Sequence, residues 1–307
     1  MERKYDTVII GPITLDHNTD YDGREEYING GAVTFAGYAA AAAGRRVAVV
    51  PKGNPAVIDP EEVFAGSHVE TIFSCYSPSC TVMENTYFTA DRERRICRNT
   101  EGILPYTRED IPVVPTGVYH LAGLVRGDIP EELIPYTALL GPVALDVQSV
   151  LRCREADDSL KLYDWPRKKE FLPYITYLKT DAAEAEVMTG LSDREEAARI
   201  MAGWGAKEVM ITHNTEVLVF DGKTVYREPI KARNLSGRTG RGDTTFSTYI
   251  AERNHTDIPE ALRFAAAMVS LKMETPGPFT GTRRDVEDYR EEFYESACFC
   301  TESREET

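Results

Sequence analysis

The sequence has no apolar run that could cross a membrane as a helix. Its 307 residues contain no stretch of about 18 consecutive apolar side chains. The first residues, Met1 to Asp6, are polar and lead straight into a strand-like segment. They lack the apolar core and the small-residue cleavage site of a secretion signal. We therefore expect a cytoplasmic protein without a membrane span.

Basic residues are outnumbered by acidic ones. The chain has 35 Lys and Arg against 50 Asp and Glu, which gives a formal net charge of −15. Nucleic-acid binding depends on basic surfaces, so this balance argues against nucleic acid as a general partner. An anionic substrate would need a local basic patch, and Arg238 with Arg241 supplies one.

Sets of Cys and His at metal-binding spacing are also lacking. The pair Cys298 and Cys300 has no second Cys or His pair at zinc-site spacing, and we expect the six cysteines to be reduced thiols. His17, His120 and His213 are scattered, and none of them is assigned to catalysis.

An alternation of strands and helices fills most of the chain. Residues 7–11 form a β-branched run that ends in glycine, residues 33–43 form a helix rich in small side chains, and residues 47–50 form the next strand. Further strands are predicted at 118–121, 143–146, 175–178, 208–212, 216–220 and 224–227, and helices near 129–139, 166–173, 181–189, 193–204, 242–253, 258–274 and 284–295. This order predicts a three-layer α/β/α fold with a mainly parallel sheet.

A different pattern appears over residues 69–98. Its short strand candidates, at 71–73, 81–83, 86–89 and 95–98, alternate polar and apolar side chains and have no helix between them. Together with residues 16–28 they predict a small antiparallel β lid, which we also expect to pair across a homodimer. The run Arg92, Arg94 and Arg95 is interpreted as a solvated edge that discourages strand pairing. We expect one domain over 1–295 and a polar tail over 296–307.

The segment 235–245 carries the most specific motif. Gly240 and Gly242 bracket Arg241, Asp243 follows at once, and a helix begins there. Bare backbone N–H groups at a helix N-terminus bind anions. A carboxylate in that position suggests proton transfer beside a bound phosphoryl group. The alternative is a glycine-rich turn before a helix that Asp243 caps.

Polar residues also stand at or just beyond the ends of several strands. Because ligands bind at the carboxyl ends of parallel strands, these residues indicate one site. They are Asp16, Asp146, Gln148, Asp181, Glu184 and Thr212. Other interpretations stay open, since Asp16 could cap a turn, and Asp181 with Glu184 has the form of a helix capping box.

On these motifs the chain resembles the ribokinase-like, phosphofructokinase-B (PfkB) family of carbohydrate kinases over roughly residues 5–290. Thr239-Gly-Arg-Gly-Asp243 is similar to the family's second signature, and Gly30-Gly31 with the following helix to its first. The other matches are Gly11 with Asp16, Asp181-Ala-Ala-Glu184, Asp146-Val-Gln148 with Arg152, Ala265 to Ala267, and Pro276-Gly277. The segment around Asp243, Asp146 to Gln148 and Tyr163-Asp-Trp165 resemble a branch often associated with inositol metabolism.

The resemblance implies roles for individual residues. The catalytic set is Asp243 as general base, with Gly240, Arg241 and Gly242 as the anion hole. The substrate set is Asp16, Gly30, Gly31, Phe35, Asp146 and Gln148. The nucleotide set is Asp181, Thr212, Asn214, Arg238, Thr239, Ala266, Pro276 and Gly277. Magnesium would be held by Glu184 through water and by Asp181.

Four positions depart from the family pattern. Gly237 and Arg238 replace an Asp-Thr pair, which puts a monovalent-cation site in doubt. Phe35 stands where ribose-binding members have Asn. Asp181 replaces an Asn, and Glu216 lies near a turn that is usually rich in glycine.

The expected activity is ATP- and Mg²⁺-dependent transfer of a phosphoryl group to a hydroxyl of a small sugar or polyol, with a cyclitol such as myo-inositol favoured. Ribose or nucleoside kinase is the alternative within the same class. A kinase-like protein that binds sugar or nucleotide without turnover is the alternative from another class.

Overall fold

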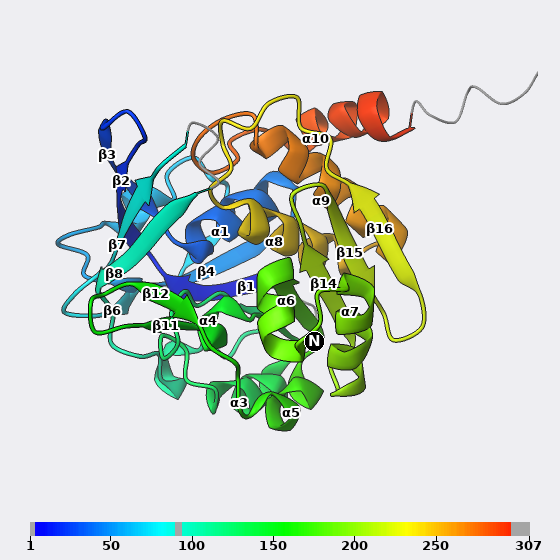
Figure 1. Ribbon diagram of the computed structural model, residues 1–307, viewed down its shortest axis with the longest axis horizontal. Helices are drawn as coiled ribbons and strands as arrows, with labels where there is room; N and C mark the ends of the chain where they lie inside the picture. The colour runs from blue at the N-terminus through cyan, green and yellow to red at the C-terminus, as the bar shows by residue number, and fades with distance from the viewer. Residues whose placement is uncertain (1–3, 90–93, 296–307) are drawn as a thin grey trace, which may run out of the picture.

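A computed structural model describes residues 4–89 and 94–295 of the chain (Figure 1). The predicted tail, 296–307, lies outside the described residues. Within the described ranges, no helix has the length and apolar character needed to span a bilayer.

A ten-stranded sheet forms the centre of the molecule. Its strands are β1 (Tyr5–Pro12), β4 (Val47–Gly53), β5 (Thr71–Ile72), β6 (Cys75–Tyr76), β9 (Thr116–Leu121), β10 (Val143–Asp146), β13 (Tyr177–Asp181), β14 (Glu208–Thr212), β15 (Glu216–Phe220) and β16 (Val225–Pro229). The order is β16-β15-β14-β13-β10-β9-β1-β4-β5, with β6 paired to β4. All pairs are parallel except those that β15 makes with β14 and β16. The hairpin signal at Asp221-Gly222 predicts the second of these, β15 with β16.

Helices cover both faces of this sheet, so the predicted three-layer fold is confirmed (Figure 1). One layer holds α1 (Ala32–Ala42), α2 (Pro60–Val63), α8 (Arg241–Arg253), α9 (Ile258–Lys272) and α10 (Arg283–Arg290). The other holds α3 (Leu133–Leu140), α4 (Gln148–Leu151), α5 (Lys168–Phe171), α6 (Ala182–Thr189) and α7 (Arg194–Gly203). Short 3-10 turns lie at Arg108–Asp110 and Leu172–Tyr174, and a π-helical turn lies at Glu291–Glu295.

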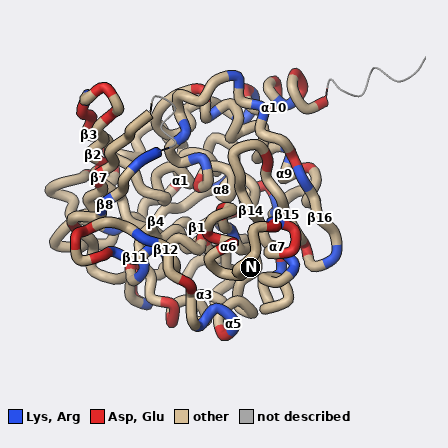
Figure 2. The backbone as a smooth tube through the Cα atoms, in the orientation of Figure 1, with Lys and Arg blue, Asp and Glu red and all other residues tan. Residues whose placement is uncertain are grey.

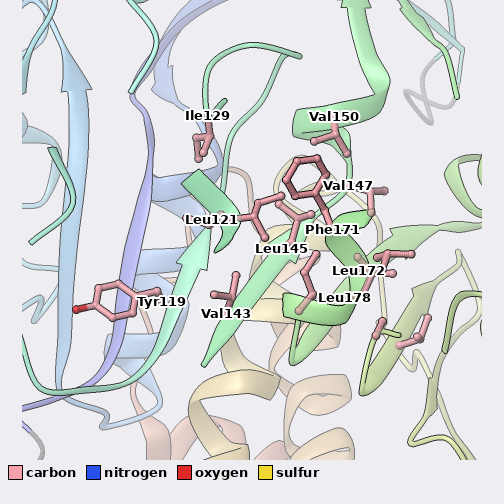
Figure 3. Close-up of a cluster of buried hydrophobic side chains, with 14 of the residues drawn as sticks. Tyr119, Leu121, Ile129, Val143, Leu145, Val147, Val150, Phe171, Leu172 and Leu178 are labelled. Carbon is pink, nitrogen blue, oxygen red and sulfur yellow. The ribbon is translucent and has the colours of Figure 1, made fainter. Parts of the chain in front are cut away.

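The core lies on both sides of the sheet because successive strand residues face opposite layers. In β1, Val8 and Ile10 join the cluster under α3, α6 and α7, whereas Ile9 packs with α1 on the other side. Figure 3 shows part of the first cluster, in which Leu121, Leu145 and Leu178 come from neighbouring strands. Such continuous burial explains why the central strands have near-continuous apolar sequences.

A second sheet forms the lid. Its strands are β2 (Thr14–Thr19), β3 (Glu25–Gly30), β7 (Thr81–Tyr87) and β8 (Arg95–Glu101), in the order β3-β2-β7-β8. The outer pairs are antiparallel, and β2 with β7 is parallel. Only Ile13 separates β1 from β2, so one extended segment passes from the main sheet into the lid.

Three details differ from the sequence-based expectations. Residues 71–72 pair with β4 in the main sheet rather than with the lid. The predicted strands 81–83 and 86–89 are one strand, β7, since polar Glu84 and Asn85 continue its alternation instead of breaking it. A hairpin of β11 (Arg152–Arg154) and β12 (Leu160–Leu162) has no counterpart among the predicted strands, because its strands are too short to show a period.

The excess of acidic residues does not form one continuous acidic region. Figure 2 shows acidic and basic positions interspersed along most of the backbone, with acidic positions gathered around the turn between β2 and β3. That turn lies at the far end of the lid.

Candidate active site

A cavity of about 400 Å³ lies between the lid and the main sheet. This is a usual size for a small-molecule site. It is lined by Thr14, Asp16, Gly31, Ala32, Phe35, Met83, Asn85, Tyr87, Arg95, Cys97, Leu124, Gln148, Arg152, Lys179, Asp181, Thr212, Arg238, Thr239, Gly240, Arg241, Gly242 and Asp243. The two carboxylates that the sequence placed at one site, Asp16 and Asp243, therefore share a cavity.

The N-terminus of α8 opens into this cavity. Helix α8 begins at Arg241, and its first helical hydrogen bond runs from the amide of Thr244 to the carbonyl of Gly240. The amides of Gly242 and Asp243 precede that bond, and such groups are available to an anion. The amide of Arg241 donates instead to the carbonyl of Arg238, at 3.2 Å.

Gly240 cannot be replaced without strain. Its φ is 77°, a left-handed conformation that favours glycine. A Cβ atom at this position would also lie 2.1 Å from the ring of Phe35. The glycine therefore permits both the turn and the close packing of α1 against the start of α8.

Asp243 is the third residue of α8, and its buried side chain lines the cavity. Burial raises its pKa to about 6, and the nearby negative charge of Asp146 acts in the same direction. Lys179 and Arg152 oppose this effect. A carboxyl group of this kind is deprotonated at neutral pH and is a stronger base than an exposed aspartate.

Below Asp243 lies a buried ammonium group, that of Lys179. Its Nζ atom is 2.9 Å from Oδ2 of Asp146 and 3.8 Å from Oε2 of Glu184. Although burial favours the neutral amine, these carboxylates raise the pKa of Lys179. Asp146, predicted as a substrate residue, is thus engaged with this lysine and does not line the cavity.

Asp181 and Glu184 form the capping box that their spacing allowed. The amide of Glu184 donates to Asp181 Oδ1 at 2.8 Å, and the amide of Asp181 donates to Glu184 Oε2 at 2.7 Å. Asp181 lines the cavity, whereas Glu184 is buried behind it and its pKa rises to about 7 through burial. In the part of the chain that the structure describes, no three His, Cys, Asp or Glu side chains converge as a metal-ligand set.

Asp16 lies on β2, in the lid. Burial raises its pKa to about 6, and the hydroxyl of Thr14 donates to its Oδ1 at 2.5 Å. A Cβ atom on Gly30 would lie 2.7 Å from Oδ2 of Asp16, so this glycine makes room for the carboxylate. Gly30 supports the site from behind, whereas Gly31 and Phe35 line the cavity itself.

The inner face of the lid supplies residues that sequence reasoning missed. These are Met83, Asn85 and Tyr87 on β7 and Arg95 and Cys97 on β8. Their every-second-residue spacing was the available signal. Arg95 is exposed on the edge strand β8, as the interpretation of a solvated edge expects, but it also lines the cavity and lowers the pKa of Asp16 through its charge. Arg94 is exposed, and Arg92 lies outside the described residues.

Two arginines at and just before the start of α8 also line the cavity. They are Arg238 and Arg241, and Nη1 of Arg241 donates to Oδ1 of Asn214 at 2.8 Å. Asn214 orients that arginine rather than lining the cavity. Three other residues of the predicted nucleotide set, Ala266, Pro276 and Gly277, are not part of the lining, and Ala266 is fully buried within α9.

This arrangement is accompanied by a match to one protein family. Residues 85–283 match the model for the pfkB family carbohydrate kinases. The chain belongs to the pfkB family. Membership makes it a phosphotransferase, a carbohydrate kinase, and the family as a whole implies ATP as the usual donor.

Several relatives of this pfkB kinase have been characterised. A pyrophosphate-dependent kinase of the ribokinase family, solved with a pyrophosphate analogue and myo-inositol, is 31% identical, with a TM-score of 0.83 over 92% of this chain and 99% of the other. A sulfate complex of such a kinase is 32% identical, with a TM-score of 0.84 over the same shares. The cytidine kinase of Thermococcus kodakarensis is 27% identical over 266 residues, which are 80% of this chain and 87% of the relative.

Proposed function

We propose that this pfkB kinase transfers a phosphoryl group to one hydroxyl of a cyclitol such as myo-inositol, with Asp243 as the general base. The observation that carries the proposal is the shared cavity of Asp16, on the lid, and Asp243, at the N-terminus of α8. An alcohol held by Asp16 lies in the same enclosed space as the base and the helix N-terminus.

The chemistry follows from these positions. Phosphoryl transfer depends mainly on in-line positioning and on stabilisation of charge. Asp243 accepts the proton of the attacking hydroxyl as the new O–P bond forms. The amides of Gly242 and Asp243, together with that of Gly240, would bind the transferring group, and Arg241 adds fixed positive charge. Loss of one such donor typically costs about 3–4 kcal/mol in the transition state.

The lining of the acceptor end favours a polyol. Asp16, Asn85 and Gln148 offer hydrogen-bonding groups from three separate elements, as several ring hydroxyls require. One relative was solved with myo-inositol. A nucleoside acceptor is the second candidate, because the cytidine kinase relative matches most of the chain.

The donor is a polyphosphate, and two are proposed. ATP is the family donor and the one that the sequence predicts. Pyrophosphate is favoured by the absence of the predicted adenine-side residues Ala266, Pro276 and Gly277 from the described cavity lining, and by the pyrophosphate-dependent relative. Arg238 and Arg241 suit the phosphates of either donor.

The residues present fit a magnesium ion that keeps most of its water. Mg²⁺ is usually held by one or two carboxylates together with the substrate phosphates. Asp181 would hold it directly or through water, and Glu184, which is engaged in the capping box, would act through Asp181. The ion would supply positive charge that offsets the negative charge of the donor phosphates.

We also propose that the lid mediates a homodimer. Its outer surface carries exposed aromatic residues, Tyr21 at 55%, Tyr27 at 63% and Phe88 at 51%. Light scattering is expected to give twice the chain mass, and Tyr27→Glu, which places a charge on this surface, is expected to give monomers. A single-chain mass for the wild-type protein would contradict the proposal.

A donor-by-acceptor matrix tests the activity. ATP and pyrophosphate are each combined with myo-inositol, other cyclitols, ribose and cytidine, and phosphorylated product is measured by mass spectrometry. We expect product with myo-inositol or a related cyclitol. Product with cytidine or ribose alone would select the alternative acceptor, and ligand-induced melting shifts without any product would support the non-catalytic alternative.

A further inference from the structure

A second buried lysine, Lys272, lies behind the N-terminus of α8. It is the last residue of α9 and has no exposed surface. Its ammonium donates to the carbonyl of Gly237 at 2.5 Å and to the carbonyl of Thr239. The same Nζ atom lies 5.2 Å from the centre of the Phe35 ring. Within the described chain, therefore, the hydrogen-bond partners of this charge are main-chain carbonyls.

The segment that Lys272 holds leads directly into the anion hole. The amide of Gly237 donates to the carbonyl of Met273 at 2.7 Å, and the hydroxyl of Ser236 donates to the carbonyl of Glu274 at 2.6 Å. A Cβ atom on Gly237 would lie 1.8 Å from the carbonyl oxygen of Thr275. This close packing fixes residues 236–239 against the end of α9.

The contact between Lys272 and the carbonyl of Thr239 also fixes the direction of the next amide, that of Gly240. In a trans peptide the C=O of one residue and the N–H of the next point in opposite directions. Lys272 binds the carbonyl of Thr239 from behind, so the N–H of Gly240 is directed away from Lys272. Gly240 lines the cavity and Lys272 does not. The lysine thus sets the direction of an anion-hole amide without touching the substrate.

We propose that Lys272 is a positioning residue that acts as a built-in monovalent cation, ordering the 237–240 loop so that turnover needs no added potassium or ammonium. The inference rests on the proposed function, since it concerns the loop that binds the transferring phosphoryl group. It also accounts for the departure at Gly237 and Arg238, where the family pattern has an Asp-Thr pair. Because the ammonium group of Lys272 would repel a second cation, an acidic residue that helps to bind such a cation is not needed here.

Electrostatics support this assignment. Burial lowers the pKa of Lys272 to about 8, and the negative charge of Asp243 counteracts that effect. The ammonium form therefore still predominates at pH 7.

The test compares two substitutions of Lys272 with one control. Lys272→Met keeps the chain length but removes the charge, and Lys272→Ala also leaves space for an ion. Lys231→Met is the matched control, because Lys231 likewise donates to a carbonyl, that of Phe293 at 2.5 Å, and lies 4.7 Å from an aromatic ring, that of Tyr294. Lys231 is not among the cavity residues.

Turnover is measured in tetramethylammonium, potassium and ammonium chloride at one ionic strength. We expect wild-type kcat to vary less than about twofold, and Lys272→Met to lose about 100-fold in kcat with little change in acceptor KM, as for loss of an anion-hole donor. Ammonium or potassium should restore about tenfold or more to Lys272→Ala and nothing to Lys272→Met. Lys231→Met should behave as wild type.

Pyrophosphate binding, measured by calorimetry, gives a readout that does not depend on turnover. Lys272→Met should weaken it about tenfold or more, and ammonium should restore it only in Lys272→Ala. A wild-type enzyme that potassium activates tenfold, or Lys272 variants that keep wild-type kcat and pyrophosphate affinity, would overturn the inference. A wild type without turnover whose anion binding still depends on Lys272 in this way would refute the proposed function alone.

Discussion

At the scale of single residues, the site depends on acidic groups whose charged form is disfavoured by burial. Burial raises the pKa of Asp16 and Asp243 to about 6 and of Glu184 to about 7. Each is charged near neutral pH only at a cost in folding free energy. The residues that define the site are therefore also residues that reduce stability.

Replacing the base should separate these two properties. Asp243→Asn is expected to lower kcat at least tenfold while leaving donor binding intact, because the amide has no basic oxygen of comparable strength. Turnover is measured by product formation and donor binding by calorimetry. Asp193→Asn, at the start of α7 and outside the cavity, is the control. More than about one-tenth of wild-type kcat in Asp243→Asn would rule out this residue as the base.

The pH dependence has opposite signs for activity and stability. With Asp243 as the proposed base, activity requires its deprotonated form, so kcat/KM should rise with pH through an apparent pKa of about 6. The folded state binds this proton more tightly than the unfolded state, so its contribution to stability falls as pH rises from about 4 to about 6. Asp243→Asn should thus melt at nearly the wild-type temperature at pH 4 and at a higher temperature at pH 7, by roughly 1–3 kcal/mol of unfolding free energy. An equal melting difference at both pH values would contradict the raised pKa.

Sequence reasoning identified the glycines and carboxylates of the site because these residues have few other uses in such positions. Asp16, Gly240 and Asp243 were all predicted and all line the cavity. Lys179 was missed, since a lysine within a buried strand gives no local pattern. Its partner Asp146 lies on a different strand, β10, and only the fold brings the two together. Glu184 is close in sequence, at the start of the next helix.

At the scale of elements, the lid strands divide their side chains between two surfaces. In β7, Met83, Asn85 and Tyr87 face the cavity, and the residues between them are half-buried on the outer face. Asn85 also donates to Oδ1 of Asn18 at 3.0 Å, which fixes its amide group. Under the proposed function, the lid therefore contributes directly to acceptor recognition.

Neighbouring positions on β7 provide a matched pair of variants. Asn85→Ala should raise the acceptor KM about 10- to 100-fold, because a hydrogen bond to a substrate hydroxyl is lost in an enclosed site. Thr86→Ala, on the opposite face of the same strand, should leave it unchanged. Both are measured by initial rates with saturating donor, and melting temperatures check folding. Equal effects from the two variants would show that the lid acts only through its stability.

The main elements were predictable because their periods are long and their caps explicit. Helix α7 begins after Asp193, whose side chain accepts from the amide of Glu196 at 2.8 Å, and it ends near the predicted residue. The membership of residues 71–72 in the main sheet was not predictable. Two residues carry no period, and their pairing with β4 depends on how the chain returns after α2.

At the scale of the whole molecule, one buried acid ties three helices together. Glu252, near the end of α8, accepts bonds at 2.8 Å from Arg45, which follows α1, and from Arg283, the first residue of α10. Although burial opposes its charge, the two guanidinium groups hold the pKa of Glu252 below its usual value. The network lies at the opposite end of α8 from Asp243.

Glu252→Gln should destabilise the protein without affecting catalysis. It leaves two arginines without their carboxylate, which typically costs about 3–5 kcal/mol for a buried pair. The loss should be largest at neutral pH and smaller in acid, because a lowered pKa contributes stability that disappears as pH falls through it. Chemical denaturation at pH 7 and pH 4 measures this, and kcat should stay within about twofold of wild type. A large fall in kcat at unchanged stability would indicate coupling along α8.

The connection at Ile13 has a consequence for energetics. Because β1 continues into β2 through this one residue, Asp16 belongs to the smaller sheet and Asp243 to the larger layer system. An alcohol that contacts both acids acts as a clamp between two bodies of the same chain. Part of the binding free energy of this alcohol then holds the two sheets together. A donor that binds between the same sheets no longer has to meet that cost, so donor and acceptor together should raise the melting temperature by more than the sum of their separate effects.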